Sequence, residues 1–414
     1  MPKTILEYLR KPNPELQLVA TTTQSTSQDF WNPIEGFEKD EDFTWENLEG
    51  PWKDVLEHKF DSASLPEPIE LLPIEKRIQS EEELQQDPVK NQMIKVNRAL
   101  QAAHLYLRGK KEAGFGHAPT YVCGSKRAVA SDAPALDKPD WHVLQSGFNR
   151  AIVCGETKLS SVFNIAYTAT AADTRYHKPV EQCLHYCIMN DTRYGFVITD
   201  KELAVLRVRR EEIGPGASND RPRRVPPAVR YSAASSSMES SMQSMSLYSG
   251  SGDRGACFVA WSRIDWNETK GLTVGLALFL LAMMASTPAG PETIGEDYGS
   301  LQNVWQFDKT DSKTRWINRV SGRTRKGLRK GDIELVDWVE HKNEQGRTYF
   351  VSYLDGTYLQ TLWSDEQKRY YVYDHYNEKE HKGQVEGMIP GRSFRARTLM
   401  MIGLIRSFND LVQH

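Results

Sequence analysis

The sequence of 414 residues has few cysteines and no hydrophobic run long enough to cross a bilayer. Its five cysteines are odd in number and scattered, which excludes a disulfide scaffold and favours a reducing, intracellular compartment, nucleus or cytoplasm. The start, "MPKTILEYLRKP", lacks the apolar segment of a secretory signal peptide. The longest apolar run, Leu272 to Ala285, spans only about four helical turns. We therefore expect it to form a buried core helix, and we expect no membrane partner.

Neither charge sign dominates, since the net charge is −3, but the charges are unevenly placed. Asp29 to Gly50 holds eight acids and one base, whereas Lys313 to Lys330 holds eight bases and no acid. The basic run suits a solvated face, a contact to a phosphate backbone or a nuclear-import patch, and its composition does not separate these. The acidic block either is solvated or occupies a positively charged cleft of the chain and competes there with an anionic ligand.

Changes in composition and sequence pattern along the chain predict three regions. Residues 1–75 contain prolines, polar tracts and the acidic aromatic block, and we expect a weakly ordered N-terminal arm. Residues 76–295 read as an α/β core, and residues 296–414 as a small α+β C-terminal extension. Ten of the 22 residues from Tyr231 to Gly252 are serine, so residues 213–254 are predicted to be a disordered insertion between two strands. Nothing indicates an oligomeric state.

The elements of the core follow from hydrophobic spacing and from helix-start signals. Ser80 with Glu83 predicts a helix start, and Pro88 predicts a break or a fresh start within that helix. Short stretches rich in Val, Ile and aromatics predict strands: "PTYVCG", "RAVAS", "DWHVL", "RAIVCGETK", "RYGFVITD" and "ELAVLRVRR". The segment "KPVEQCLHYCIMND" has helical spacing. In the extension we expect antiparallel strands, with a turn at Asp355–Gly356, and a terminal helix from Arg397 to Gln413.

Glu156 and Lys158 stand two residues apart where the strand "RAIVCGETK" ends. Residues i and i+2 of a strand share a face, so both side chains project together. Asp140, sixteen residues upstream in "KPDW", begins another strand and can converge with Glu156. Two carboxylates beside one ammonium suit a hard divalent cation. The plain alternative is a solvated strand end, with Asp140 as a turn cap. Downstream, Gln182 and Tyr186 fall on one helix face.

The order Pro139–Asp140, then Glu156-x-Lys158, then a Gln182-x-x-x-Tyr186 helix resembles the PD-(D/E)XK nuclease superfamily, in its RecB-like branch. The segments "KPDW", "GETK", "KPVEQCLHY" and "GLTVGLALFLL" are also similar to a family of fungal proteins that carries this domain. The resemblance covers roughly residues 80–290. It implies a three-layer α/β/α restriction-endonuclease-like core with a mixed sheet.

By this resemblance, Asp140, Glu156 and the Thr157 carbonyl would bind Mg²⁺ or Mn²⁺, and Lys158 would stabilise the attacking water and the phosphate. Gln182 and Tyr186 would hold the scissile strand or the water. Glu81, Glu82 or Glu83 on the first helix are further candidates. The implied function is metal-dependent hydrolysis of DNA; the alternative is a non-catalytic binding protein with a nuclease fold, such as a defence, drive or effector component. Cys183, His185 and Cys187 on one helix suggest zinc or simple packing.

Overall fold

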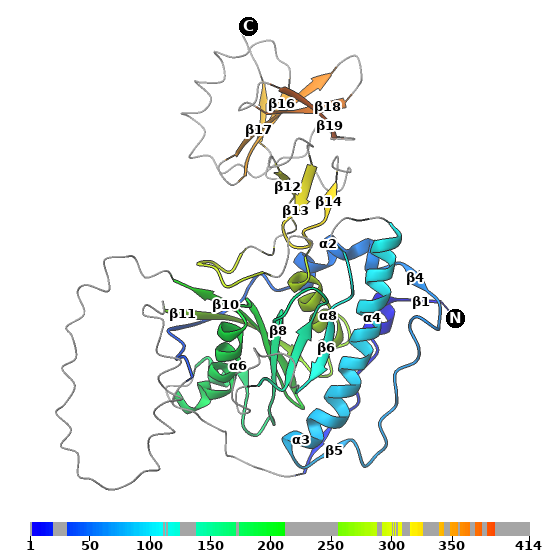
Figure 1. Ribbon diagram of the computed structural model, residues 1–414, viewed down its shortest axis with the longest axis vertical. Coiled ribbons are helices and arrows are strands. Elements are labelled where there is room, and N and C mark those ends of the chain that lie inside the picture. The colour runs from blue at the N-terminus through cyan, green and yellow to red at the C-terminus, as the bar shows by residue number, and fades with distance from the viewer. Residues whose placement is uncertain are drawn as a thin grey trace, which may run out of the picture.

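A computed structural model provides the structure of the chain (Figure 1). It describes these residues: 2–19, 31–110, 112, 115–124, 138–170, 174–211, 256–287, 292–299, 301, 303, 305–308, 315–325, 339–342, 348–354, 357–364, 369–374 and 379–385. The Ser-rich insertion, the strand expected at "RAVAS", the Asp355–Gly356 turn and the terminal helix lie outside these residues.

A mixed sheet of seven strands forms the centre of the α/β fold, in the order β3-β11-β10-β9-β8-β7-β6. Its strands are β3 (Gly36–Lys39), β6 (Thr120–Cys123), β7 (Trp141–Leu144), β8 (Val153–Thr157), β9 (Tyr194–Ile198), β10 (Glu202–Arg210) and β11 (Cys257–Asp265). The pairs β8–β9 and β3–β11 are parallel and the other pairs antiparallel. A tight turn joins β9 to β10, where the Thr199 amide donates to Glu202 O at 2.8 Å.

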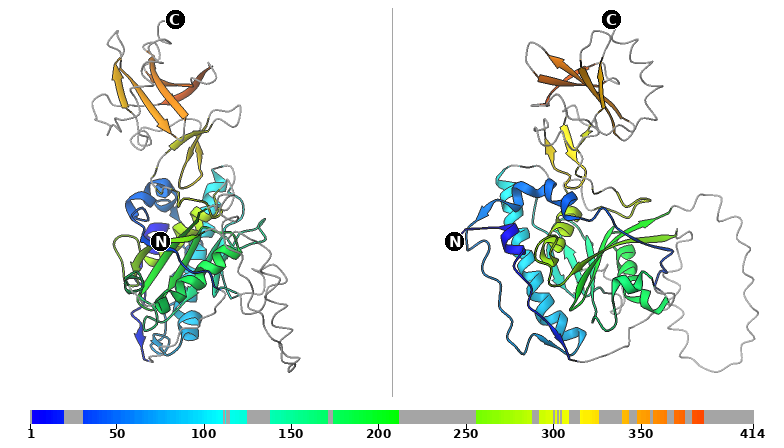
Figure 2. Two further views of the ribbon diagram at one scale, coloured as in Figure 1. Left: turned by 90° about the vertical axis from the view of Figure 1, so that its left-hand side faces the viewer. Right: turned by 180° about the vertical axis from the view of Figure 1, so that it is seen from behind.

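Helices cover both faces of this sheet (Figures 1 and 2). On one face lie α4 (Lys90–Gly109) and α8 (Val274–Ala285), and their apolar residues join the core that contains Val153 and Phe196. On the other face lies α6 (Lys178–Met189), whose residues pack with Cys154 and Val197. Alternate residues of β8 therefore face different helical layers, as the period of a strand requires.

The helix α8 is buried along its whole length, and every residue from Val274 to Ala285 is inaccessible or nearly so. Thr273 begins it, because its side chain accepts a hydrogen bond from the Leu276 amide. The expectation of a buried core helix is confirmed. Among the described residues, no helix is long and apolar enough to span a membrane.

The helix predicted after Ser80 is divided at Pro88. Ser80 caps α3 (Glu81–Leu84) by accepting from the Glu83 amide, and Glu83 accepts from the Gln79 amide. A π-helical turn, Gln85–Val89, contains Pro88, and α4 follows without a gap. The proline, which cannot donate an amide hydrogen bond, is thus absorbed by a wider turn and does not stop the helix.

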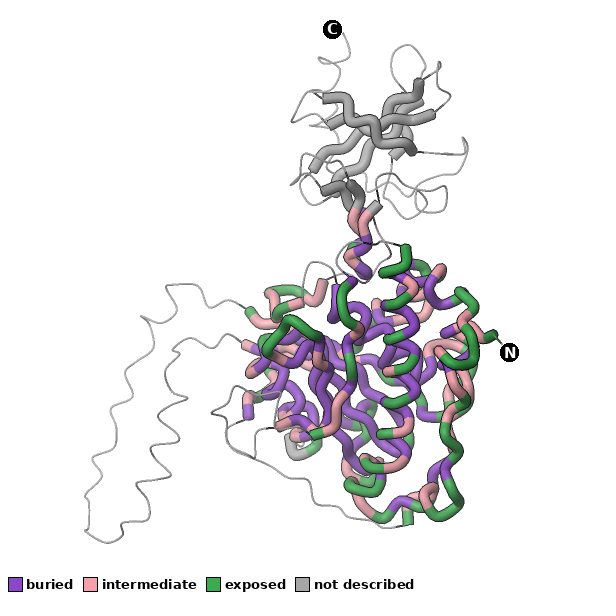
Figure 3. The backbone as a smooth tube through the Cα atoms, turned by 45° about the vertical axis from the view of Figure 1, so that its right-hand side comes forward, coloured by how far each residue is buried: buried purple, intermediate pink, exposed green. Residues whose placement is uncertain are grey.

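The N-terminal segment differs from the weakly ordered arm that its composition predicts. Its elements are β1 (Lys3–Thr4), α1 (Ile5–Leu9), β2 (Gln17–Leu18), β3, α2 (Trp45–Leu56) and β4 (Lys59–Phe60). β3 forms an edge of the central sheet, and Trp52 of α2 is fully buried in the same core as α4. Buried stretches of the backbone run through the centre of the α/β fold (Figure 3). Except for the buried Asp40, the acids from Glu35 to Glu49 are partly or fully exposed, whereas Phe43 and Trp52 are buried, which composition alone does not reveal.

The remaining short elements are β5 (Arg77–Ile78), α5 (Ile165–Thr168) and a 3-10 turn (Thr174–His177). Beyond residue 300, a three-stranded sheet contains β12 (Trp305–Asp308), β13 (Arg315–Asn318) and β14 (Thr324–Arg325). A five-stranded antiparallel sheet follows, with β15 (Val339–Lys342), β16 (Thr348–Leu354), β17 (Thr357–Ser364), β18 (Arg369–Asp374) and β19 (Lys379–Val385).

Candidate active site

The pairing of β7 with β8 brings Asp140 and Glu156 together. Trp141 pairs with Gly155 and His142 with Cys154, so the next step of this antiparallel register sets Asp140 beside Glu156 on one face. The Asp140 amide donates to Glu156 Oε1 at 3.2 Å, and the Thr157 amide donates to Asp140 Oδ2 at 2.9 Å. The two residues are therefore fixed by main-chain hydrogen bonds at the end of the sheet.

Lys158 follows the last residue of β8, and its ammonium contacts two carboxylates. Its Nζ lies 3.5 Å from Glu156 Oε2 and 3.4 Å from Glu81 Oε2. Of the three candidate acids on the first helix, Glu81 is thus the one that reaches the site, while Glu83 serves the helix cap. The predicted site residues Asp140, Glu156 and Lys158 therefore lie close together.

The π-helical turn helps to position this arrangement. Gln85, its first residue, donates from Nε2 to the Asp140 carbonyl at 3.4 Å. This contact connects the segment that carries Glu81 with the start of β7. Sequence reasoning missed Gln85, although a π-helical turn often accompanies a functional site and the proline that shapes it is visible in the sequence.

A second missed residue, Asp200, supports the chain just after Lys158. Asp200 accepts from the Ser160 amide and from Ser160 Oγ, both at 2.8 Å, and it is buried. The Lys158 amide donates to Ile198 O at 3.0 Å, so the strand end is held from β9 and from the turn after it. The available signal was an acid directly after the buried strand "RYGFVIT".

Burial dominates the electrostatics of the site. Glu156 is 1% exposed, and its burial, reinforced by the nearby Asp140 charge, raises its pKa well above the ordinary value. Burial also raises the pKa of Asp140 and that of Glu81. The Lys158 pKa is raised although burial opposes it, because Glu156, Glu81 and Asp140 favour the ammonium. Three carboxyl groups thus face one ammonium, and full ionisation leaves an excess of negative charge.

The side chains of the site offer the type of ligand atom, carboxylate oxygen, that a hard divalent cation binds. Asp140 and Glu156 offer carboxylate oxygens, which Mg²⁺ and Mn²⁺ prefer, and the excess negative charge favours a cation. Among the described residues, no group of three or more His, Cys, Asp and Glu side chains is placed to hold a metal ion. A site built on Asp140 and Glu156 therefore needs another oxygen ligand, for which the Thr157 carbonyl is the sequence-based candidate.

Gln182 and Tyr186 lie on α6, the helix that covers β8 and β9. Gln182 Nε2 donates to the Tyr186 hydroxyl at 3.3 Å, and in the described part of the chain this is the only hydrogen bond of the Gln182 side chain. Glu156 acts electrostatically on the neighbouring residue Cys183. The structure thus places this pair on the helix facing the site, without a hydrogen bond from Gln182 to the carboxylates.

Cys183 and Cys187, considered above as zinc ligands, pack α6 against the sheet. Both are fully buried, and a side chain at Gly195 would meet their sulfur atoms at 2.8 and 2.9 Å. Their thiols donate to main-chain carbonyls of Phe196 and Tyr194 at 3.5 Å. The absence of a side chain at Gly195 allows this close approach between helix and strand.

One arginine of the basic run has an internal role. Arg323 is 4% exposed, and its guanidinium contacts both oxygens of Asp54 and both of Glu112. It therefore attaches the segment after β13 to α2, which the solvated or phosphate-binding interpretations did not anticipate. Residues 313–314 and 326–330 of the run lie outside the described residues.

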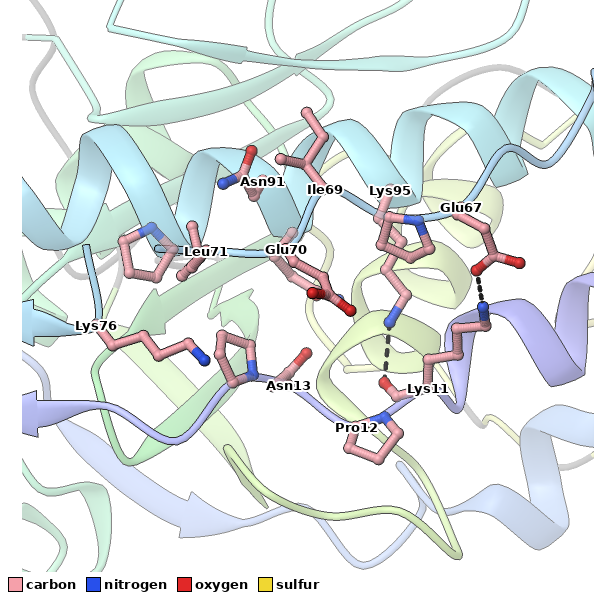
Figure 4. A pocket seen from close by; sticks show the side chains of 14 residues that line it. Lys11, Pro12, Asn13, Glu67, Ile69, Glu70, Leu71, Lys76, Asn91 and Lys95 are labelled. Atoms are coloured by element: carbon pink, nitrogen blue, oxygen red, sulfur yellow. Dashed lines mark hydrogen bonds and ion pairs between the residues drawn. The ribbon is translucent and has the colours of Figure 1, made fainter. Parts of the chain in front are cut away.

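A separate pocket of about 450 Å³ lies between residues 11–14, residues 67–71 and α4 (Figure 4). On its wall, Lys95 Nζ donates to Lys11 O at 3.0 Å and to Leu9 O at 3.5 Å. These carbonyls lie at the C-terminal end of α1, so the ammonium acts as a helix cap. Lys11 in turn pairs with Glu67. The pocket contains none of the predicted site residues.

Comparison with known proteins gives no relative, since no family model, no curated protein and no solved structure matches the chain.

Proposed function

We propose that the chain is a metal-dependent nuclease that hydrolyses phosphodiester bonds of DNA, with a three-layer α/β/α restriction-endonuclease-like core. The observation that carries the proposal is the convergence of Asp140, Glu156 and Lys158 at one end of a mixed sheet. Glu156 and Lys158 are buried and Asp140 is partly buried, so this cluster of charges costs folding free energy, and charges kept at such a cost are typical of functional sites. The sequence order that resembles the PD-(D/E)XK superfamily supplies the second support.

Each residue has a defined part in this proposal. Asp140, Glu156 and the Thr157 carbonyl would hold Mg²⁺ or Mn²⁺, which supplies Lewis-acid stabilisation of the phosphate and a more acidic water. Lys158 places a positive charge beside the carboxylates, where it stabilises the negative charge that develops on the phosphate. Glu81 and Glu156 keep Lys158 protonated and oriented. Gln182 and Tyr186 would position the DNA strand from α6.

A cleavage assay on linear, circular and single-stranded DNA, with Mg²⁺ or Mn²⁺, tests this function. We expect divalent-dependent cleavage that Lys158→Met reduces by roughly 100-fold or more, as loss of one charge-stabilising donor does elsewhere. Lys53→Met, which removes an exposed lysine of α2, is the matched control and should cleave like the wild type. A folded wild type with no cleavage of any of these DNAs would disprove the hydrolytic function.

One observation favours a second candidate, a non-catalytic binding protein with the same fold. The Lys158 ammonium already pairs with both Glu81 and Glu156, so the cluster is also consistent with a buried ion network that only supports the structure. In that case Lys158→Met would change stability and leave nucleic-acid binding intact. The cleavage assay and a thermal melt of the same variant distinguish the two functions.

A further inference from the structure

A pocket of about 510 Å³ lies beside the C-terminal half of α4 and has an acid-free lining. Its polar lining consists of amide, hydroxyl, imidazole and guanidinium side chains, among them Arg98, Gln101, Arg108, His117 and Thr120. None of its described lining residues is an Asp or a Glu. Hydrogen-bond donors and positive charge with no opposing carboxylate favour an anionic ligand.

The exposed surface of α4 is likewise basic and without acidic residues along the helix. The 20 residues from Lys90 to Gly109 include no acidic residue, and Lys90, Arg98 and Arg108 are exposed. These three side chains form no hydrogen bond or ion pair with any other residue that the structure describes. Charged groups that a fold uses internally are paired, as Arg323 is, so the unpaired basic groups of α4 are available to a ligand.

The strand β6 connects the pocket with the candidate active site. Asn97 of α4 bonds to both the amide and the carbonyl of Tyr121, at 2.8 and 2.9 Å, so helix and strand lie side by side. At the far end of β6, the Gly124 amide donates to Asp140 O at 2.6 Å. Thr120, at the near end, lines the pocket. The strand thus leads from the pocket to Asp140 over about 10 Å.

The start of α4 also lies near the candidate active site. Gln85, the first residue of the π-helical turn that runs into α4 at Lys90, donates to the Asp140 carbonyl at 3.4 Å. Further along α4, Arg98 lies about 12 Å and Arg108 about 27 Å from Lys90, measured along the helix axis. B-form DNA rises about 3.4 Å along its axis per base pair, so for a duplex aligned with α4 the 15 Å between the two arginines corresponds to roughly four base-pair steps.

We propose that the exposed face of α4 and its pocket form the DNA-binding track of this protein, which contacts the phosphates on one side of the scissile bond. This inference rests on the proposed nuclease function and adds the surface that holds the substrate. Lys90 contacts the phosphates nearest the carboxylates, and Arg98 and Arg108 contact those further along the same strand. The pocket of Figure 4 is less suited to this role, because Glu67 and Glu70 line it together with its lysines.

A binding titration separates this inference from catalysis. Fluorescent DNA is titrated with the full chain in EDTA at several salt concentrations, so that the result does not depend on cleavage. The test variant is Arg98→Gln/Arg108→Gln, which retains good helix formers at exposed positions. The matched control is Lys39→Gln/Lys53→Gln, which removes the same charge from exposed positions of the N-terminal segment. Thermal melts establish that both variants are folded.

We expect the α4 variant to bind DNA about 10-fold or more weakly at low salt. We also expect its plot of log K against log salt to lose a slope of roughly 1.4 to 1.8, the value for two phosphate contacts. The control should keep the wild-type slope. Equal losses in both double variants, an unchanged affinity in the α4 variant, or a wild type that does not bind DNA would overturn the inference.

Cleavage in Mg²⁺ is measured separately, so the two proposals can fail independently. If the wild type cleaves DNA while the α4 variant binds and cleaves normally, the nuclease function stands and the α4 track is wrong. If the wild type binds through α4 but never cleaves, the track stands and the hydrolytic function is wrong.

Discussion

The backbone amide of Asp140 donates a hydrogen bond of 3.2 Å to Glu156 Oε1, so one acid of the candidate site is held by the main chain of the other. The side chain of Asp140 is held in the same way by the strand of Glu156, because the Thr157 amide donates to Asp140 Oδ2. The antiparallel register of β7 and β8 creates both contacts. A pair held in this way has little freedom to separate, and its repulsion has to be relieved by protons, by Lys158 or by a cation.

Replacing Glu156 by glutamine should stabilise the protein in the absence of divalent ions. The variant keeps the shape of the side chain and removes a buried charge close to Asp140, so we expect an increase of about 1 kcal/mol in the free energy of unfolding. Thermal melts in EDTA check the sign. Added Mg²⁺ or Mn²⁺ should stabilise the wild type more than the variant. A wild type more stable than the variant in EDTA, with no response to either ion, would contradict this account.

The stability of the metal-free protein should fall as pH rises above the ordinary carboxyl range. Burial raises the folded-state pKa of Glu156 and of Asp140, so between the unfolded and folded values the folded state binds more protons than the unfolded chain. The free energy of unfolding decreases with pH wherever this holds. Urea titrations in EDTA from pH 4.5 upward measure the slope, which Glu156→Gln should reduce. A slope that the substitution leaves unchanged would mean that other groups titrate.

Local pattern predicts much of the core, because strand and helix periods depend on neighbouring residues. The buried helix α8, the departure from regular α-helix around Pro88 and the strand end at Glu156 are visible in this way. The place of the N-terminal segment is not visible, since β3 joins the sheet beside β11, more than 200 residues away. Likewise, Glu81 reaches Lys158 only because the π-helical turn and β7 meet, which no local spacing encodes.

The buried pair of Asp40 and Arg207 tests whether the N-terminal segment belongs to the core. Asp40 accepts hydrogen bonds of 2.5 and 2.8 Å from the Arg207 guanidinium, and both side chains are nearly inaccessible. Asp40→Ala leaves the Arg207 charge without its carboxylate, so we expect a loss of about 3–5 kcal/mol in the free energy of unfolding. Urea unfolding measures it.

The double variant Asp40→Ala/Arg207→Met is the control for this pair, because it removes both charges. It should recover part of the lost stability, since no guanidinium then remains without its carboxylate. A loss below about 0.5 kcal/mol in Asp40→Ala, the range of ordinary surface substitutions, would instead indicate that the segment is a detachable arm.

The free energy of unfolding of the wild type, relative to that of a Lys95→Met variant, should increase as pH rises from about 8 to about 10.5. Burial, with a smaller effect of the Lys11 charge, lowers the pKa of Lys95 to about 8. The unfolded chain keeps the ordinary lysine value near 10.4 and so binds more protons than the folded state in this window. Stability therefore rises with pH there, by at most about 3 kcal/mol.

Urea titrations of the wild type and Lys95→Met between pH 7.5 and 10.5 provide the measurement. The variant loses the hydrogen bonds to Leu9 O and Lys11 O at every pH, so that loss shifts its stability by a constant amount and leaves the pH slope as the signal. Groups such as Lys158 titrate in both proteins and cancel in the difference. Lys39→Met, at an exposed position, is the matched control and should differ from the wild type by a constant. A flat difference for Lys95→Met as well would mean that Lys95 keeps an ordinary pKa and is more hydrated than its burial indicates.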